Sequence, residues 1–513
     1  MNPSIIDRVV RVLGWCVFGL AVGAPLIGLL IDVVSSGQPP RGGWWLSEGQ
    51  WMLLGKSAVL GSLAGIGSLV LAVPGAMVIA GRRGSVRPIL MVLFVCPLLF
   101  PPTVTAFGWD KLTASDAPLA GALRWAGLAA LTEGPARTVW VWSCWLWPVA
   151  ALLLWIGWRR QGRAAYELAI IDAGRARALV FGALPAMRLF PAAAWIAVFA
   201  ICMTDYQVPH ACGQLVYATE LMSWVTETGR SIDVAWPALP LVGLIVLVVV
   251  GLLRWARRGM DFWTFETRGR SLGGPRSVIV LCIVVGVTVA APIGALIVST
   301  DLGPAMTRAW AVYAGELGDS LAVAGAAMIG SVLVGEALCG GGRVGHLLAV
   351  VMLLGGVLPG ALVGQSLVAT YLRIPAVYDH WPVMVLTQVA RFGWIGVLAA
   401  WVSRWSFPAH TLEQARVDGA SEAQVKRFVY WPVVWPIVAA GGAAFVAMAI
   451  AEVPATSLTR VPGIGSVALR LIEEFHRFQD DMLVALSLWL CAAVLPAAAL
   501  LTVALYRRRM AIA

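Results

Sequence analysis

Long uninterrupted stretches of apolar residues alternate along the chain with short polar segments that are rich in Arg. A helix rises about 1.5 Å per residue and the hydrocarbon core of a bilayer is about 30 Å thick, so about 20 apolar residues can cross it. The pattern therefore predicts an all-α membrane protein with twelve transmembrane helices. The predicted spans are 9–34, 52–80, 88–109, 138–157, 189–207, 237–256, 277–299, 319–339, 347–371, 382–402, 433–453 and 482–505.

Composition agrees with this interpretation and excludes a soluble enzyme. Of 513 residues, 60% are hydrophobic and only 12% are charged, about half the share found in soluble domains. A net charge of +10 could indicate a nucleic-acid partner. The Arg clusters, however, flank apolar spans, where they orient a protein in the membrane, so we expect lipid contact and no nucleic acid. Seven of the eight Cys residues lie inside apolar stretches, which indicates no disulfide framework.

The distribution of positive charge predicts the orientation of the chain. With the N-terminus in the cytoplasm, 25 of the 37 Lys and Arg residues fall on cytoplasmic segments and 10 on the opposite side. By the positive-inside rule, both termini are then cytoplasmic. No small-residue cleavage site follows the first span, so we expect it to remain in the mature protein.

Short motifs recur between the two halves of the chain. Lys56-Ser57 is matched by Asp319-Ser320, 263 residues later, in the second span of each predicted half. Phe100-Pro101-Pro102 is matched by Leu358-Pro359-Gly360 in the third span. Six spans separate the copies, so both halves have the same orientation. The matches therefore predict two parallel six-helix repeats, related by an axis along the membrane normal.

The predicted division is a first half at 1–256, a cytoplasmic linker at 257–276 and a second half at 277–513. Paired halves around one axis suggest a central translocation path. Two classes of protein fit this arrangement: secondary transporters of the major facilitator type, and fused permeases of importers that are driven by separate ATPases.

The loop between the fourth and fifth spans of each half distinguishes these classes. About thirty residues is long for a connection between helices, which usually takes about 2–8 residues. In the second half, good helix formers precede Gly419, which can adopt the positive φ of a helix stop, and Pro432 can open the next span. The loop is therefore predicted to be a stiff helix–turn–helix in the cytoplasm. Glu167 and Asp172 of the first loop match Glu413 and Asp418 of the second, 246 residues later.

These loops resemble the EAA loop of permease subunits of binding-protein-dependent ABC importers. That pattern is Glu-Ala-Ala, three residues, Gly, and a Pro about a dozen residues on. The residues that carry the resemblance are Glu413, Ala415, Asp418, Gly419 and Pro432 in the second loop, and Glu167, Ala169, Asp172, Gly174 and Pro185 in the first. The first copy has Ala-Gly where the second has Gly-Ala, so its turn is expected to differ.

The resemblance implies the type I ABC importer permease fold and a location in the bacterial inner membrane. In that family the loop forms a coupling helix that sits in a cleft of a cytoplasmic ATP-binding subunit. The implied partners are two such subunits and a periplasmic or extracellular substrate-binding protein.

The chain itself has no recognisable nucleotide site, so we expect no enzymatic activity in it. Gly55-Lys56-Ser57 resembles the end of a P-loop, but Gln50 occupies the position of the required first Gly. ATP and Mg²⁺ would then bind the partner subunit, and this chain would bind no cofactor. Five scattered His residues lack metal-ligand spacing, which predicts no metal site. Residues 81–87 lie between the second and third spans, where major facilitator proteins have a Gly/Asp/Arg motif, but they lack its Asp. A facilitator-type carrier is therefore kept only as the alternative class.

Three charged residues within the spans are candidates for the translocation path or its gate. Asp205 and Glu452 occupy matched positions, and a Pro, Pro209 or Pro454, follows each. A carboxylate at that depth costs several kcal/mol unless it is paired or hydrated, so it should face a cavity or gate, or else reach the interface. Arg391 lies in the middle of the tenth span, where it could meet an anionic or chelated ligand or pack against a helix end.

The stretch 452–460 is similar to part of the second half of fused ferric-iron permeases. This similarity implies ferric iron as the transported substrate. Fused permeases also serve thiamine and phosphonate importers, which remain alternatives.

Overall fold

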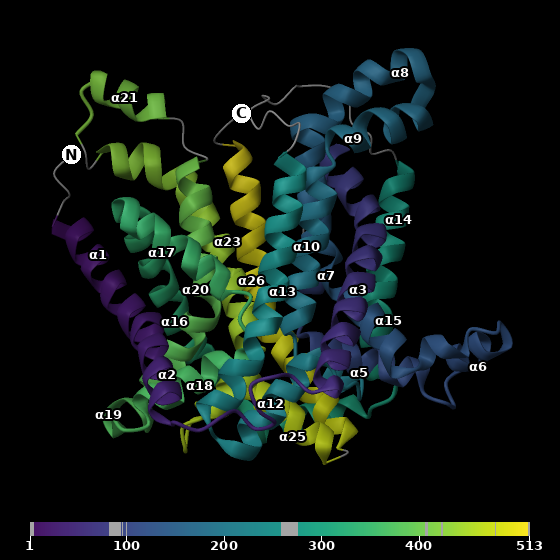
Figure 1. Cartoon of the computed structure of the whole chain (residues 1–513). Helices are drawn as coiled ribbons and strands as arrows, with labels where there is room; N and C mark the ends of the chain where they lie inside the picture. Colours follow the sequence, from purple (N-terminus) through teal and green to yellow (C-terminus); the bar gives the residue numbers. More distant parts are fainter. Residues whose placement is uncertain are drawn as a thin grey trace. The chain divides into compact units, whose positions relative to one another are not determined.

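The computed structural model describes residues 5–81, 94, 96–98, 100–257, 275–405, 409–421, 424–477 and 479–510, and these residues form helices and loops without a strand (Figure 1). Within this part of the chain, eight helices are long and apolar enough to cross a membrane. A ninth is reached if the helix pair Gly342–Gly355 and Gly360–Tyr371, bent by 119°, counts as one span. The protein is therefore a multi-pass membrane protein. Part of the predicted third span and most of the predicted linker, residues 258–274, lie outside the described residues.

The chain forms two compact units. Unit 1 contains 1–44, 221–236 and 300–513, and unit 2 contains 45–220 and 237–299. The helices of unit 1 are α1 Ile5–Phe18, α2 Ala24–Ser35, α16 Leu302–Gly340, α17 Gly342–Gly355, α18 Gly360–Tyr371, α19 Pro375–Tyr378, α20 Trp381–Trp405, α21 Ala409–Val417, α23 Trp431–Ile450, α24 Pro454–Leu458, α25 Val467–His476 and α26 Asp480–Met510. Each unit thus contains helices from both predicted halves. The division of the chain into two halves at 257–276 remains a prediction from the repeated motifs.

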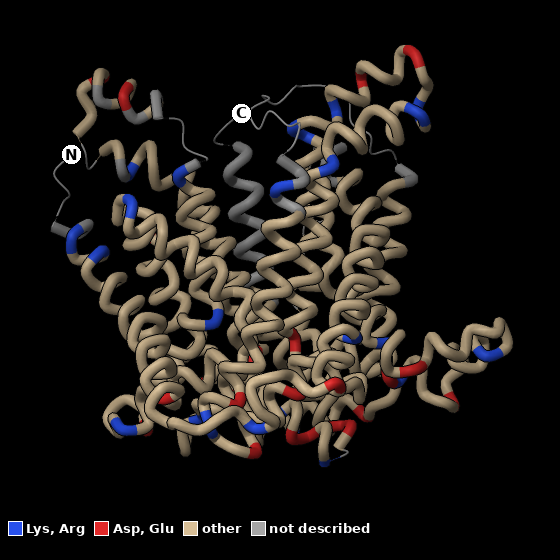
Figure 2. Tube along the Cα trace, in the orientation of Figure 1, with Lys and Arg blue, Asp and Glu red and all other residues tan. Residues whose placement is uncertain are grey.

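The helices of unit 2 are α3 Glu48–Gly81, α5 Pro102–Thr113, α6 Pro118–Trp125, α7 Gly134–Gly157, α8 Arg163–Arg177, α9 Leu184–Ala186, α10 Leu189–Thr204, α11 Gln207–Ala211, α14 Pro275–Val285 and α15 Ala291–Val298. Two more helices, α12 Tyr217–Thr228 and α13 Ser231–Arg257, continue from one unit into the other. In each unit, charged residues gather toward the ends of the helices and are sparse along the middle (Figure 2). Charge is thus scarce where a bilayer would be driest.

Glycines bring the central helices of unit 1 into backbone contact. Gly335 of α16 faces Gly396 of α20, and a Cβ at 396 would lie 2.6 Å from the carbonyl carbon of Ser331. The Gly396 N–H donates to Ser331 Oγ at 3.2 Å. Lipid tails are as apolar as the side chains, so helices in a bilayer associate through such close packing and through interhelical hydrogen bonds.

A local likeness of the two units appears in their tightest helix pair. Gly67 of α3 lies against Ser143 of α7 in unit 2, and Gly330 of α16 lies against Val389 of α20 in unit 1.

The core of unit 2 is built around the fully buried Trp147, which packs edge-on against Phe94 with 5.4 Å between ring centroids. Leu281, from α14, belongs to the same core.

The first helix of each predicted half contains a widened turn before a proline. The π-helical segment η1, Gly19–Gly23, precedes Pro25 in α2, and η5, Gly286–Ala290, precedes Pro292 in α15. A proline ring clashes with the carbonyl four residues earlier, and a π-turn removes this clash without ending the helix. In unit 1, α2 lies against α18, and Tyr371 Oη of α18 donates to the Leu20 carbonyl of η1 at 2.5 Å. In unit 2, α15 lies against α5.

We predict that Gly396→Ala lowers the apparent melting temperature in detergent, because the new methyl group meets the backbone of α16. Overpacking of this kind typically costs about 1–3 kcal/mol. Gly325→Ala is the matched control on α16, because a Cβ there meets no atom within 4 Å. Equal melting temperatures for the two variants would show that the helices can separate without cost.

Candidate functional site

The loop between α7 and α10 of unit 2 is a helical hairpin. Helix α8 turns at Gly174, which has φ 73°, and continues into the π-helical segment η4, Ala178–Ala183. The two arms touch at Gly182, where a Cβ would lie 2.7 Å from Ala169 Cβ. Arg163 Nε donates to Glu167 Oε1 at 3.0 Å along α8. Ion pairing and close packing therefore stiffen the hairpin.

The large apolar side chains of this hairpin point away from the packed unit. Ile171 is 79% exposed and Phe181 is 76% exposed, and Leu168 is similarly open. Asp172 is also exposed, and Pro185 lies in the first turn of α9, where the chain returns toward α10. The hairpin thus presents an apolar surface beside the exposed Arg175 and Arg177.

The loop between α20 and α23 of unit 1 is built in the same way. Helix α21 ends at Val417, and the φ of 82° at Gly419 confirms the predicted helix stop. The Ala420 N–H donates to the Ala415 carbonyl at 3.0 Å. The next helix is capped reciprocally, because the Ser421 N–H donates to Gln424 Oε1 and the Gln424 N–H donates to Ser421 Oγ.

The second loop also exposes apolar side chains. Val417 is 86% exposed, and Phe428 of the π-helical segment η6, Val425–Tyr430, is 66% exposed. Glu413 and Asp418 face solvent, and Pro432 is in the first turn of α23. Gly174 and Gly419 both have a positive φ, although the order is Ala-Gly in the first loop and Gly-Ala in the second.

Asp205 and Glu452 each cap a break between two helices. Asp205 follows α10 and accepts hydrogen bonds from the N–H groups of Gln207 and Val208 at the start of α11. Glu452 follows α23, is 3% exposed and accepts from the N–H groups of Ala455 and Thr456 in α24, at 3.0 and 2.9 Å. These carboxylates replace the helical partners that backbone donors lose at a break.

Each capping carboxylate is also tied to the preceding span. Trp142 Nε1 of α7 donates to Asp205 Oδ2 at 2.7 Å. In unit 1, Gln388 Nε2 of α20 donates to Thr456 Oγ1, which in turn donates to Glu452 Oε2 at 2.8 Å. The prolines of these motifs are buried, Pro209 inside α11 and Pro454 at the start of α24. The breaks are thus fixed in place rather than open.

Arg391 lies against a helix end. Its Nη1 donates to the Leu358 carbonyl at 2.6 Å, at the break between α17 and α18, and its guanidinium lies over the Phe392 ring at 5.6 Å. A cation is favourable there, because the last carbonyls of a helix carry partial negative charge. Of the two roles that the sequence left open for Arg391, this geometry provides the helix-end contact.

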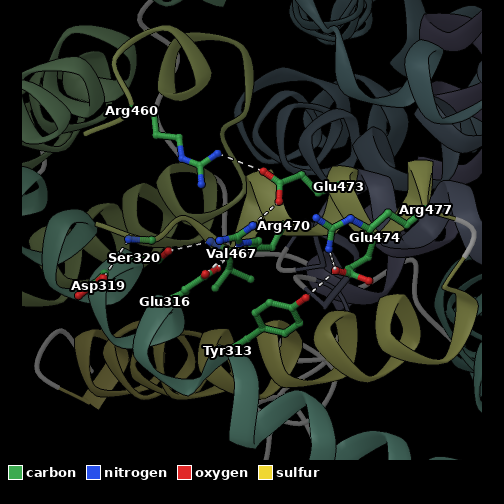
Figure 3. Close-up of polar contacts among 11 residues, drawn as sticks. Tyr313, Glu316, Asp319, Ser320, Arg460, Val467, Arg470, Glu473, Glu474 and Arg477 are labelled. Carbon is green, nitrogen blue, oxygen red and sulfur yellow. Dashed lines mark hydrogen bonds and ion pairs between the residues drawn. The ribbon is translucent and has the colours of Figure 1, made fainter. Parts of the chain in front are cut away.

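A network of charged side chains joins α16 to α25 in unit 1 (Figure 3). Arg470 Nε donates to both oxygens of Glu316, at 2.8 and 2.9 Å, and Arg470 Nη1 donates to Glu473. Glu473 Oε1 also accepts from Arg460 at 3.1 Å. Burial alone would raise the pKa of the Glu473 carboxyl, but the hydrogen bonds and charges of Arg470 and Arg460 outweigh it and lower that pKa.

A second carboxylate of the same helix is buried. Glu474 is 1% exposed, and its Oε1 accepts from Tyr313 Oη at 2.5 Å and from Arg477 at 3.3 Å. The sequence analysis gives this cluster no role. The spacing of Arg470, Glu473 and Arg477 indicates pairing along one helix, whereas the partners on α16 lie more than 150 residues away.

Within the described residues, no three His, Cys, Asp or Glu side chains gather in a group that could hold a metal ion. No protein-family model matches the chain, and neither a curated protein nor a solved structure matches it.

We predict that Glu452→Ala destabilises the protein by about 2 kcal/mol, because two backbone donors and one hydroxyl lose a buried acceptor. Glu452→Gln keeps one acceptor oxygen at the same place and should lose less. Thermal unfolding of both variants in detergent measures the difference. An unchanged melting temperature for Glu452→Ala would mean that water or another group replaces the carboxylate.

We predict a pH-dependent contribution from Glu473. Because its pKa is lowered in the folded protein, its contribution to stability is complete above the ordinary glutamate pKa of about 4.3 and is lost as pH falls through the lowered value. Glu473→Gln should remove this contribution, which we place at about 1 kcal/mol or less for a partly exposed pair. Melting curves between about pH 6 and 3.5 should therefore fall more steeply for the parent chain than for the variant.

Glu227→Gln is the control for this experiment. Glu227 pairs with Arg41 at 2.5 Å, but both side chains are more than half exposed. Its removal should leave the pH dependence unchanged, since exposed pairs contribute little. Parallel curves for the parent chain and Glu473→Gln would contradict the role given to Glu473.

Proposed function

We propose that the chain is a fused permease subunit of an ATP-driven importer that receives its substrate from a separate binding protein. One observation carries the proposal: two exposed helix–turn–helix loops of the same design follow corresponding spans, α7 and α20. Each loop is stiffened internally and exposes large apolar side chains. Exposed apolar patches of this kind favour a protein partner.

The physical requirement for such a lever supports the proposal. An ATPase that closes on nucleotide can move membrane helices only through a rigid element that it binds. The Gly182–Ala169 contact and the Ser421–Gln424 cap support this rigidity. The ATPase would then bias two arrangements of the permease by differential affinity, which is the thermodynamic content of coupling.

A twelve-span architecture of two parallel repeats belongs to the same proposal. Its support is a set of matched local contacts: Ser57 Oγ accepts from the Tyr217 N–H at 2.9 Å, and Ser320 Oγ accepts from the Val467 N–H at 3.0 Å. The carboxylate-capped breaks after α10 and α23 are a second match. We further propose a bacterial inner membrane location with both termini cytoplasmic, from the distribution of Lys and Arg.

For the substrate we propose ferric iron, with thiamine and phosphonates as alternatives, on the strength of the sequence around Glu452. The iron would be cargo delivered by the binding protein. In the structure Glu452 is a helix cap, so the resemblance at 452–460 concerns the local fold around the break as much as any ligand contact.

The test is reconstitution of the chain with the ATP-binding subunit and the secreted binding protein encoded beside it. We expect ATP-dependent accumulation of ⁵⁵Fe³⁺ in proteoliposomes. The double variant Ile171→Asp/Val417→Asp should lose co-purification of the ATPase and at least about tenfold of uptake, because it places charge in both apolar contact surfaces.

Leu215→Asp is the control, since Leu215 is an exposed apolar residue outside both loops. Both variants must elute as single species with parent melting temperatures. Uptake without any ATPase would overturn the proposal and favour a secondary carrier. Uptake that is ATP-dependent but selective for thiamine or a phosphonate would overturn only the choice of iron.

A further inference from the structure

Unit 2 carries a hairpin that has no counterpart of similar length in the second half of the chain. It occupies 114–133 between α5 and α7, whereas only 372–380 separate α18 from α20. Helix α6 forms its first arm, a turn at Gly127 with φ 73° follows, and the 3₁₀ segment η2, Ala129–Thr132, returns toward α7. The hairpin projects from the end of α5 and α7 (Figure 1).

The tip of the hairpin is entirely apolar and entirely exposed. Seven consecutive residues, Trp125 to Leu131, contain no charged or hydrogen-bonding group other than the indole N–H, and all are open to the surroundings. Trp125 is 92% exposed. Several backbone groups at the turn are paired internally: the Leu128 N–H donates to the Leu123 carbonyl at 2.8 Å and the Gly127 N–H to the Arg124 carbonyl at 3.0 Å.

Short connections tie the hairpin to α5 and α7. Four residues connect α5 to α6, and α7, which belongs to a segment of spanning length, begins at Gly134, directly after Glu133. The ion pair between Arg137 and Asp110, 2.5 Å long, marks the polar level at the base of the hairpin. The base of the hairpin therefore lies at the end of a span, and the hairpin runs sideways from it rather than along α7 (Figure 1), a direction that keeps the tip near the same level.

No charged residue lies within the tip, although Arg124 directly precedes it. Arg124 Nη2 folds back to the Ser115 carbonyl at 2.8 Å, and Asp116 and Glu133 stand at the two ends. A protein-binding patch usually mixes apolar anchors with a polar rim that makes hydrogen bonds. An apolar tip with an exposed Trp and paired backbone groups suits the lipid interface instead, where Trp is enriched.

We propose that residues 125–131 insert into the headgroup–acyl boundary of the bilayer and anchor unit 2 laterally. The occupant of this surface is lipid, and neither a second protein nor a second copy of this chain is required. The inference stands apart from the proposed transport function, because it depends only on the chain crossing a membrane.

The test uses a nitroxide spin label on Leu128→Cys in nanodiscs of phosphatidylcholine and phosphatidylglycerol. Cys16, Cys96 and Cys282, which are not fully buried, are first replaced by Ala. Power saturation then compares accessibility to O₂, which concentrates in lipid, with accessibility to a water-soluble nickel chelate. We expect the O₂-to-nickel ratio at 128 to exceed that of a label on Asp116→Cys by at least about fivefold.

A label on Trp125→Cys gives a second measurement at the same depth, in case one variant fails to reconstitute. Equal ratios at 116, 125 and 128 would place the tip in water and overturn the proposal. Protection of 125 and 128 that appears only when the binding protein or an ATPase is added, or only at high protein density, would identify a protein surface and overturn it as well.

Discussion

A backbone group that leaves its helix inside a bilayer must find another partner, because no water is available there to replace the lost hydrogen bond. This constraint governs the breaks in both units. At the ends of α10 and α23 the orphaned N–H groups of the following helices are accepted by Asp205 and Glu452. At the break between α17 and α18, Arg391 donates to the exposed carbonyl of Leu358. Charged residues along the spans thus permit bends that an apolar chain could not sustain.

The same constraint explains how far the sequence predicts the fold. Apolar length alone identifies the spanning helices, since any such stretch must be helical in lipid. It does not reveal the 119° bend in the predicted span 347–371, because Gly356 and Pro359 permit a bend without fixing its angle. It also misses the shortness of α10, which ends at Thr204 where Asp205 begins to cap the next helix. The boundaries depend on side-chain hydrogen bonds that no periodicity encodes.

The sequence also predicts the candidate site residues only in part. A helix stop at Gly419 follows from good helix formers before a glycine, and the structure has it at φ 82°. The spacing from carboxylate to proline at 205 and 452 predicted a place on the translocation path or its gate, which stays a prediction; it did not predict that the partners of these carboxylates are backbone donors two to four residues away. Two roles of Arg391 are consistent with its sequence; the structure provides the contact with the Leu358 carbonyl, and a ligand contact stays a prediction. The sequence has an Ala-Pro pair in the first helix of each predicted half, at Pro25 and Pro292. Each pair directly follows one of the two π-helical segments, η1 or η5.

The two units resemble each other locally, but one junction differs in its chemistry. Helix α3 of unit 2 and helix α16 of unit 1 are each hydrogen-bonded to a short helix, α12 or α25, through different groups. In unit 2, α3 contacts the start of α12 and the segment before it through two hydrogen bonds. The Tyr217 N–H donates to Ser57 Oγ, and Lys56 Nζ donates to Gln214 Oε1 at 3.2 Å. In unit 1 the matching Ser320 contact is reinforced by Asp319, which accepts from the Gly465 N–H, and by the Glu316–Arg470 pair.

Hydrogen bonds between charged groups are about twice as strong as neutral ones, and a bifurcated guanidinium contact also fixes orientation. Leu53 stands at the position in α3 that corresponds to Glu316, so unit 2 has no equivalent of this pair there. The Glu316–Arg470 pair therefore resists a displacement of α16 along its axis relative to α25. The junction of α3, where the charged donor Lys56 meets a neutral amide, resists sliding less, so we expect α16 and α25 to move together more closely than α3 and α12.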